Sequence, residues 1–197
     1  MRLQMGAAVL LCALTRIASA DSWAAPDVIG YASPTGQRVV RVIPGTDKGA
    51  VFGFAGAPRG NVAKAFIYRL DVTGHYRERR EVPLLNPVAP VYAAITDAGE
   101  MVTLDNWHNM GIGSSVVVVY SPEGSVVRSL GLRDLYSSAE LEKFRITTSS
   151  IWWRCESEPV LVPRGPSLEF LDALGSIVEI SLKTGEVKRR PMSRVGC

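Results

Sequence analysis

The sequence predicts an all-β fold made of antiparallel, blade-like sheets in a propeller-like arrangement that is partial or open. Short runs of β-branched and aromatic residues alternate with tight turns along the chain, as in hairpins. Three hairpins turn at Gly74, Gly124 and Gly185, with spacings of 50 and 61 residues, of the order of one propeller blade. Hairpins with a turn glycine also occur in other β-proteins, so the repeat alone leaves a different sheet architecture open.

The stretch from Val91 to Leu132 predicts one complete sheet of four short strands. Its tight turns are Asp97-Ala98-Gly99 and Pro122-Glu123-Gly124, which are rich in turn-forming residues. A polar cluster beginning at Asp105 falls at the end of the second strand. We therefore expect the rest of the chain to be organised around this blade-like unit.

Strands are expected on both sides of this unit, bounded by glycine, proline and polar turns. Before it, strands are predicted at 28–31, 38–43, 50–55, 65–70 and 75–82. After it, they are predicted at 146–153, 168–171, 177–182 and 186–190, with a proline-rich loop at 156–166. A short helix over 139–144, an insertion near 138–144, is predicted because Ser137 and Glu140 have the spacing of a capping box.

Two charged stretches predict edge strands. These are Arg77 to Glu81 and Lys188 to Pro191. Charges and proline on an edge strand prevent its unpaired backbone groups from recruiting other strands. We interpret both stretches as solvated outer strands rather than binding patches.

Residues 1–20 have the pattern of a cleaved signal peptide. Arg2 precedes an apolar run from Met5 to Leu14, and Ala18-Ser19-Ala20 has small residues at the spacing that signal peptidase accepts. The apolar run is about ten residues long, whereas a membrane-spanning helix needs roughly 20. A lipoprotein modified at Cys12 is the alternative, although Leu11 stands where a small residue is expected.

Cleavage after Ala20 predicts an exported protein, periplasmic or secreted, with a single β-rich domain over residues 21–197 and no membrane span. The mature chain keeps 20 basic and 19 acidic residues, a net charge of +1. Such a chain has no net electrostatic attraction to nucleic acid. Its basic clusters are also not interleaved with stacking aromatics, so nucleic acid is not an expected partner.

The cysteines predict one disulfide. Only Cys155 and Cys197 remain after cleavage, and exported compartments are oxidising. Two cysteines, two histidines and no C-x-x-C motif argue against a cysteine and histidine metal site. No metal and no cofactor are expected.

The polar cluster Asp105-Asn106-Trp107-His108-Asn109 is the richest in chemistry. The chain has no G-x-S-x-G, H-E-x-x-H, P-loop or G-x-G-x-x-G motif, so the common enzyme classes lose support. An Asp that orients a His is half of a general-base arrangement, and a strand that turns after Asn109 could bring Asp105 to His108. A calcium loop fails because Trp107 stands where an oxygen ligand is needed. The plain alternative is that these residues brace the turn by pairing buried polar groups.

A second cluster contains Trp152, Trp153 and Arg154. Adjacent residues of a strand face opposite sides, so one tryptophan is expected at a surface or under the Cys155 loop. Core packing is one interpretation. The other is an aromatic platform for a sugar or a peptide, with Arg154 as a polar contact.

Several segments together resemble uncharacterised exported bacterial proteins with β-propeller-like repeats. The segments are Thr103 to His108, Gly111 to Gly113, Val117 to Tyr120, Gly124, Val127 to Ser129, Leu132 to Leu135 and Ser149 to Arg154. The resemblance covers about 50 residues. It implies the fold and export and assigns no catalytic residue.

The leading functional hypothesis is a binding or interaction module that uses its blade-end loops. The candidate binding residues are Trp107, His108, Asn109, Trp152 and Arg154, and the partner is a protein, peptide or carbohydrate. One alternative is a hydrolase that uses His108 with Asp105. The other is a structural component of the cell envelope.

Overall fold

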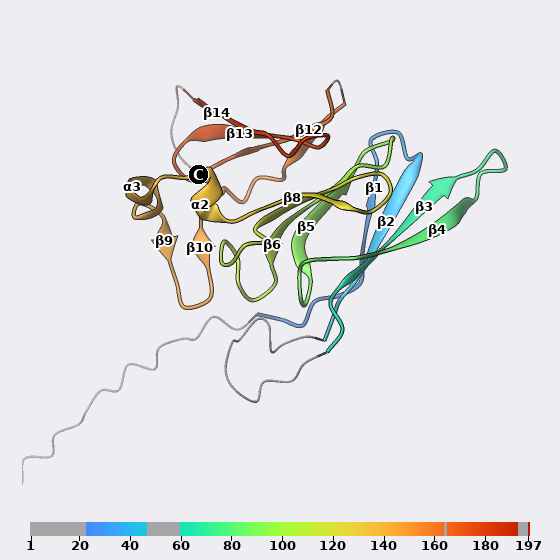
Figure 1. Cartoon of the computed structure of the whole chain (residues 1–197), viewed down its shortest axis with the longest axis horizontal. Helices are drawn as coiled ribbons and strands as arrows, with labels where there is room; N and C mark the ends of the chain where they lie inside the picture. The colour runs from blue at the N-terminus through green and yellow to red at the C-terminus, as the bar shows by residue number, and fades with distance from the viewer. Residues whose placement is uncertain (1–22, 47–59, 164, 193–196) are drawn as a thin grey trace, which may run out of the picture.

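Three four-stranded antiparallel sheets form the computed structural model, which describes residues 23–46, 60–163, 165–192 and 197 (Figure 1). The first sheet contains β1 (Ile29–Ala32), β2 (Arg38–Ile43), β3 (Lys64–Leu70) and β4 (Tyr76–Pro83). The central sheet contains β5 (Pro90–Ile95), β6 (Met101–Asn106), β7 (Val117–Tyr120) and β8 (Val126–Leu130). The third sheet contains β11 (Val160–Val162), β12 (Ser167–Leu171), β13 (Ser176–Ser181) and β14 (Val187–Pro191).

Each sheet is a meander in which neighbouring strands follow one another in sequence. The fold is therefore all-β and propeller-like, with an open arrangement of blades, as predicted. The N-terminal hairpin supplies the first two strands of the first sheet and does not form a further blade. The expected signal peptide at 1–20 and the expected strand at 50–55 lie outside the described residues.

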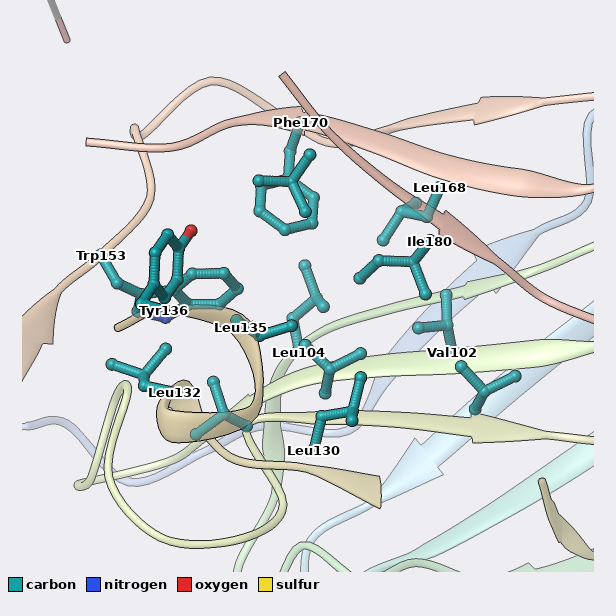
Figure 2. Packing of buried hydrophobic residues seen from close by; sticks show 14 of the residues in the cluster. Val102, Leu104, Leu130, Leu132, Leu135, Tyr136, Trp153, Leu168, Phe170 and Ile180 are labelled. Carbon is teal, nitrogen blue, oxygen red and sulfur yellow. The ribbon is translucent and has the colours of Figure 1, made fainter. Parts of the chain in front are cut away.

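The central sheet is packed on both faces. All residues of β6 and β7 are buried, because the first sheet covers one face and the third sheet covers the other. Val40, Ile67 and Val82 of the first sheet pack with one face. Leu168, Phe170 and Ile180 of the third sheet pack with the other (Figure 2). Strands buried on both faces read as continuous apolar runs, as Val116–Tyr120 does.

Tight hairpin turns of one kind join most strands. A Ser, Thr or Asp carbonyl accepts a hydrogen bond from a glycine N–H three or four residues later, in the pairs Ser33/Gly36, Asp71/Gly74, Thr96/Gly99, Ser121/Gly124, Asp172/Gly175 and Ser181/Gly185. Each of these glycines has a positive φ, which costs glycine little. Gly74, Gly124 and Gly185 all lie between the third and fourth strands of their sheets, so the repeat seen in the sequence is a blade repeat.

The charged edge strands are confirmed, and two other predictions are corrected. β4 and β14 are the last strands of their sheets. The strand expected at 146–153 is instead a small hairpin of β9 (Arg145–Ile146) and β10 (Ile151–Trp152), because the hydroxyl residues between them form a turn. The loop expected at 156–166 contains β11, an edge strand flanked by prolines that pairs with β12.

The helical insertion is confirmed but shorter than predicted. α3 covers Ser138–Leu141, and Glu140 Oε2 accepts a hydrogen bond from the Ser137 N–H at 2.9 Å, as the capping box requires. A second short helix that the sequence did not predict, α2 (Leu132–Leu135), precedes it. Among the described residues, no helix is long and apolar enough to cross a membrane.

The long connections gather at one end of the blades. In a meander, the turn between the second and third strands and the connection to the next sheet leave from the same end. The Trp107 turn, the Asp172 turn and the segment from α2 to β10 therefore share that end (Figure 1). This end holds the Asp105–Asn109 cluster and the Trp152–Arg154 cluster.

Candidate functional site

Asp105 is the buried centre of the site. Its side chain has no solvent exposure, and its φ of 62° departs from the strand, which ends the alternation of faces along β6. Its Oδ1 accepts hydrogen bonds from the N–H of Gly111 at 2.9 Å and from Nε1 of Trp153 at 2.7 Å. Its Oδ2 accepts from Nε of Arg154 at 2.9 Å. One carboxylate therefore joins the Trp107 turn to the Trp153-Arg154 segment.

Burial and charge oppose one another at Asp105. Loss of water raises the pKa of Asp105 above its ordinary value, and this effect outweighs the opposing influence of the Arg154 charge and of the three hydrogen bonds. Arg154 is itself nearly buried, with 11% of its side chain exposed. Asp105 is thus the charged partner of a nearly buried Arg154.

A buried amide network supports the unusual backbone at Asp105. Nδ2 of Asn86 donates to the Asp105 carbonyl and to Oδ1 of Asn106, both at 2.9 Å. Thr103 Oγ1 donates to Oδ1 of Asn86 at 2.9 Å. Asn86 comes from the connection between the first and central sheets, so the network links two blades.

Asp105 and His108 do not form a pair. The hydrogen-bond and ionic partners of the Asp105 carboxylate are Gly111, Trp153 and Arg154, all within the described chain. His108 has a positive φ of 70°, and its ring centroid lies 6.0 Å from that of Trp23. The strand end does turn as expected, but the turn presents the Gly111 N–H, not the imidazole, to the carboxylate.

Trp107 packs against residues 23–24, which we call the N-terminal strap. Trp107 Nε1 donates to the Ala24 carbonyl at 2.8 Å, and its ring lies edge-to-face against Trp23 with the centroids 5.4 Å apart. Trp23 Nε1 donates to Oγ of Ser149 at 3.1 Å. Residues 23–24 therefore tie the Trp107 turn to the β9–β10 hairpin, and Asn109 forms part of the same turn through its N–H to the Asn106 carbonyl.

A cleft of about 700 Å³ lies beside the β9–β10 hairpin. Cationic and aromatic side chains line it together with the disulfide, and the lining includes Lys143, Arg145, Trp152, Arg154, Cys155, Glu156 and Cys197. Its volume is within the usual range for small-molecule sites, about 300–1,000 Å³. Of the five residues expected to bind a ligand, Trp152 and Arg154 line this cleft, whereas Trp107, His108 and Asn109 do not.

Two residues that line the cleft carry polar groups without a partner in the described chain. Nε1 of Trp152 is buried and donates no hydrogen bond to a described residue. Arg154 uses only its Nε, toward Asp105, and its two terminal nitrogens bond to no described residue. A guanidinium held in this way offers its terminal nitrogens to a ligand in the cleft.

The disulfide and further charges complete the wall. Cys155 and Cys197 form the expected disulfide, with 5.1 Å between their Cα atoms. The guanidinium of Arg145 lies 5.9 Å from the centroid of the Trp152 ring. Glu156 adds a negative charge to this otherwise basic lining.

Sequence reasoning missed Lys143, Arg145 and Glu156 at the cleft and Trp23 in the strap. The sequence carries a signal for Lys143 and Arg145, because basic residues flank the tryptophan pair within a dozen residues. Trp23 carried no such signal, since its partner Ser149 is 126 residues away. In the described part of the chain, no group of three or more His, Cys, Asp or Glu is placed to hold a metal ion.

Comparison with known proteins assigns no family. No protein-family model matches the chain, and no curated protein matches it in sequence.

Proposed function

We propose that the protein is an exported binding module that holds a carboxylate-bearing ligand in the Trp152 cleft. The observation that carries this proposal is the Arg154 guanidinium: Arg154 lines the cleft, Asp105 fixes its Nε, and its terminal nitrogens have no partner in the described chain. Arginine presents paired N–H groups that match the two oxygens of a carboxylate.

Trp152 supplies the second half of the recognition. Trp152 lines the cleft, and its Nε1 is a hydrogen-bond donor that is buried without a partner in the described chain, so a small movement of the side chain presents it to a ligand. An indole binds flat ring faces such as those of sugars and aromatic side chains, and its N–H orients a polar group. The ligand is therefore an acid with a ring face, of the size of an acidic disaccharide or a short peptide with a free carboxylate.

Asp105 acts in this proposal as a positioning residue. It does not reach the ligand, because its side chain is fully buried, and it orients Arg154 instead. The hydrolase that uses Asp105 with His108 has less support, since the carboxylate is already shared by three other donors. Turnover that is abolished by His108→Ala alone would favour the hydrolase.

Calorimetry with matched acid and neutral probes tests the proposal. Glucuronate is compared with glucose, and N-acetylphenylalanine with its amide, so that only the carboxylate differs within each pair. We expect the acid of at least one pair to bind and the neutral partner not to bind. The pair that responds distinguishes a sugar ligand from a peptide ligand.

Arg154→Lys is the informative variant, because it keeps the charge beside Asp105 and removes the guanidinium fork. Loss of one charge-assisted hydrogen bond, about 1.5 kcal/mol or more, lowers affinity about tenfold. Arg133→Lys, at an exposed arginine of α2 outside the cleft, is the control and leaves affinity unchanged. Equal binding of acids and neutral probes, or unchanged affinity in Arg154→Lys, would favour a structural envelope role instead.

A further inference from the structure

The two outer sheets each have one face that no described residue of another sheet covers. In the first sheet, Val40 and Ile67 face the central sheet, so Val39, Arg41 and Phe66 point the other way. In the third sheet, Leu168 and Ile180 face the central sheet, so Glu169 and Glu179 point away from it. In the central sheet, by contrast, both faces are buried against a neighbouring sheet.

Each free face combines half-buried apolar side chains with charge. The first sheet carries Val39, Ile43, Phe66 and Tyr68, and the third sheet carries Val162, Ile177 and, at its border with the Trp152 cleft, Leu171. The middle strands of the first face are basic, with Arg41 on β2 and Lys64 on β3. The middle strands of the third face are acidic, with Glu169 opposite Glu179, whereas its edge strand β14 is basic, with Lys188 opposite Glu179 and Arg190 opposite Ile177.

One charge on each of these faces lacks a partner in the described chain. Lys64 pairs with Glu81, and Glu169 pairs with Arg190. Arg41 and Glu179 have no hydrogen-bond or ionic partner among the described residues, and two facing carboxylates such as Glu169 and Glu179 repel one another. The basic middle strands of the first face, which carry the free Arg41, and the acidic middle strands of the third face are complementary in charge.

We propose that a second copy of the chain covers these faces, with the first sheet of each copy stacked on the third sheet of the other. One copy has three four-stranded sheets in its described part, and a closed propeller has at least four. Two copies supply six. Because the two faces differ, the contact is made twice and closes a two-fold symmetric ring.

The buried area is sufficient for such a dimer. Four strands about 4.8 Å apart, about five residues long at about 3.3 Å per residue, cover roughly 300 Å² on one face. Four faces meet in the ring, which gives roughly 1,200 Å² in total, and stable interfaces begin at about this size.

Sedimentation equilibrium of the exported protein tests the ring through a charge swap. The wild-type protein should have twice the mass of one chain. Arg41→Glu places a carboxylate against Glu179 at both contacts, and Glu179→Lys places an ammonium group against Arg41 at both, so each variant alone should be monomeric. In a dimer of one copy of each variant, one contact has the wild-type pair of Arg41 and Glu179 and the other has the same pair with its charges reversed. Both contacts then join opposite charges, so an equimolar mixture should return to the dimer mass.

Thermal melting followed by circular dichroism checks that each variant is folded, and Arg133→Glu, on neither face, should remain dimeric. If Arg41→Glu does not fold, Glu179→Lys alone decides, since a dimer of that variant contradicts the proposal. A monomeric wild type, a mixture that stays monomeric, or a mass that grows with concentration beyond two chains would each overturn it. These outcomes do not depend on ligand binding, so the ring and the cleft can fail separately.

Discussion

Asp105 shows what one residue does when the chain around it departs from regular strand geometry. Its neighbours in sequence suggested a pair with His108, but its partners are Gly111, six residues on, and Trp153 and Arg154, 48 and 49 residues on. The sequence could indicate that the cluster matters, because it gathers five polar or aromatic residues. It could not indicate the partners, because the positive φ at Asp105 and the stacking of sheets decide them.

Replacement of Asp105 by alanine should destabilise the protein strongly. The change leaves the Arg154 charge nearly buried and unpaired, and removal of one partner of a buried ion pair costs about 3–5 kcal/mol. Urea unfolding measures the loss. Asp27→Ala, at an exposed carboxylate, should change the free energy of unfolding by less than about 0.5 kcal/mol. Similar stabilities for the two variants would contradict the role assigned to Asp105.

A strand, turn or helix was predictable where the residues that determine it lie close together in the sequence. The hairpins with a Ser, Thr or Asp and a following glycine were predictable because the turn forms within four or five residues. The strand β11 and the helix α2 were not, because β11 depends on pairing with β12 and the buried Leu132 and Leu135 of α2 on the core between sheets. Of the cleft, the sequence suggested Trp152 and Arg154 but not the cations brought to them by folding.

Helix α3 is held to strand β14 by an ion pair that acid should break. Arg189 Nη2 lies 2.5 Å from Glu140 Oε1, and this hydrogen bond is the main cause that lowers the pKa of Glu140 to about 2. A carboxylate with a lowered pKa adds stability above its unfolded value of 4.5, and this stability is lost as the pH falls toward about 2. The wild-type melting temperature should therefore fall more steeply than that of Glu140→Gln between pH 4.5 and 2.

Glu142→Gln is the matched control, because it removes a carboxylate at the end of the same helix that has no ion pair in the described chain. Its acid dependence should follow the wild type. If Glu140→Gln also follows the wild type, the ion pair does not contribute to stability in solution.

At the scale of the whole molecule, a central blade buried between two others explains why the stretch from Val91 to Leu132 dominates the sequence. Its strands carry the apolar residues of two interfaces, whereas the outer sheets carry those of one. The number of blade-like units followed from turn spacing. The turn spacing could not indicate which sheet is buried on both faces, since that depends on which sheet lies in the middle.

Reduction of the disulfide should lower the melting temperature. Cys155 and Cys197 are 42 residues apart, and the loop-entropy model gives about 4 kcal/mol for such a crosslink, an upper figure. For a chain of this size, a loss of this order lowers the melting temperature by up to about 16 °C. Scanning calorimetry with and without reductant measures the change. The Cys197→Ser variant should not respond to reductant, and a wild type that is equally insensitive would show that the crosslink adds no stability.

The central claim is that a carboxylate ligand binds against Trp152, and the indole N–H resonances of the ¹⁵N-labelled protein test it most directly. The chain has four tryptophans, of which Trp23, Trp107 and Trp153 have Nε1 donors occupied within the protein, whereas Nε1 of Trp152 has no partner in the described chain. Titration with the acid probe that binds should move the Trp152 resonance, assigned by loss of its signal in Trp152→Phe, and leave Trp107 unchanged. Movement of the Trp23 and Trp107 resonances with Trp152 unchanged would contradict the account and place the ligand at the N-terminal strap instead.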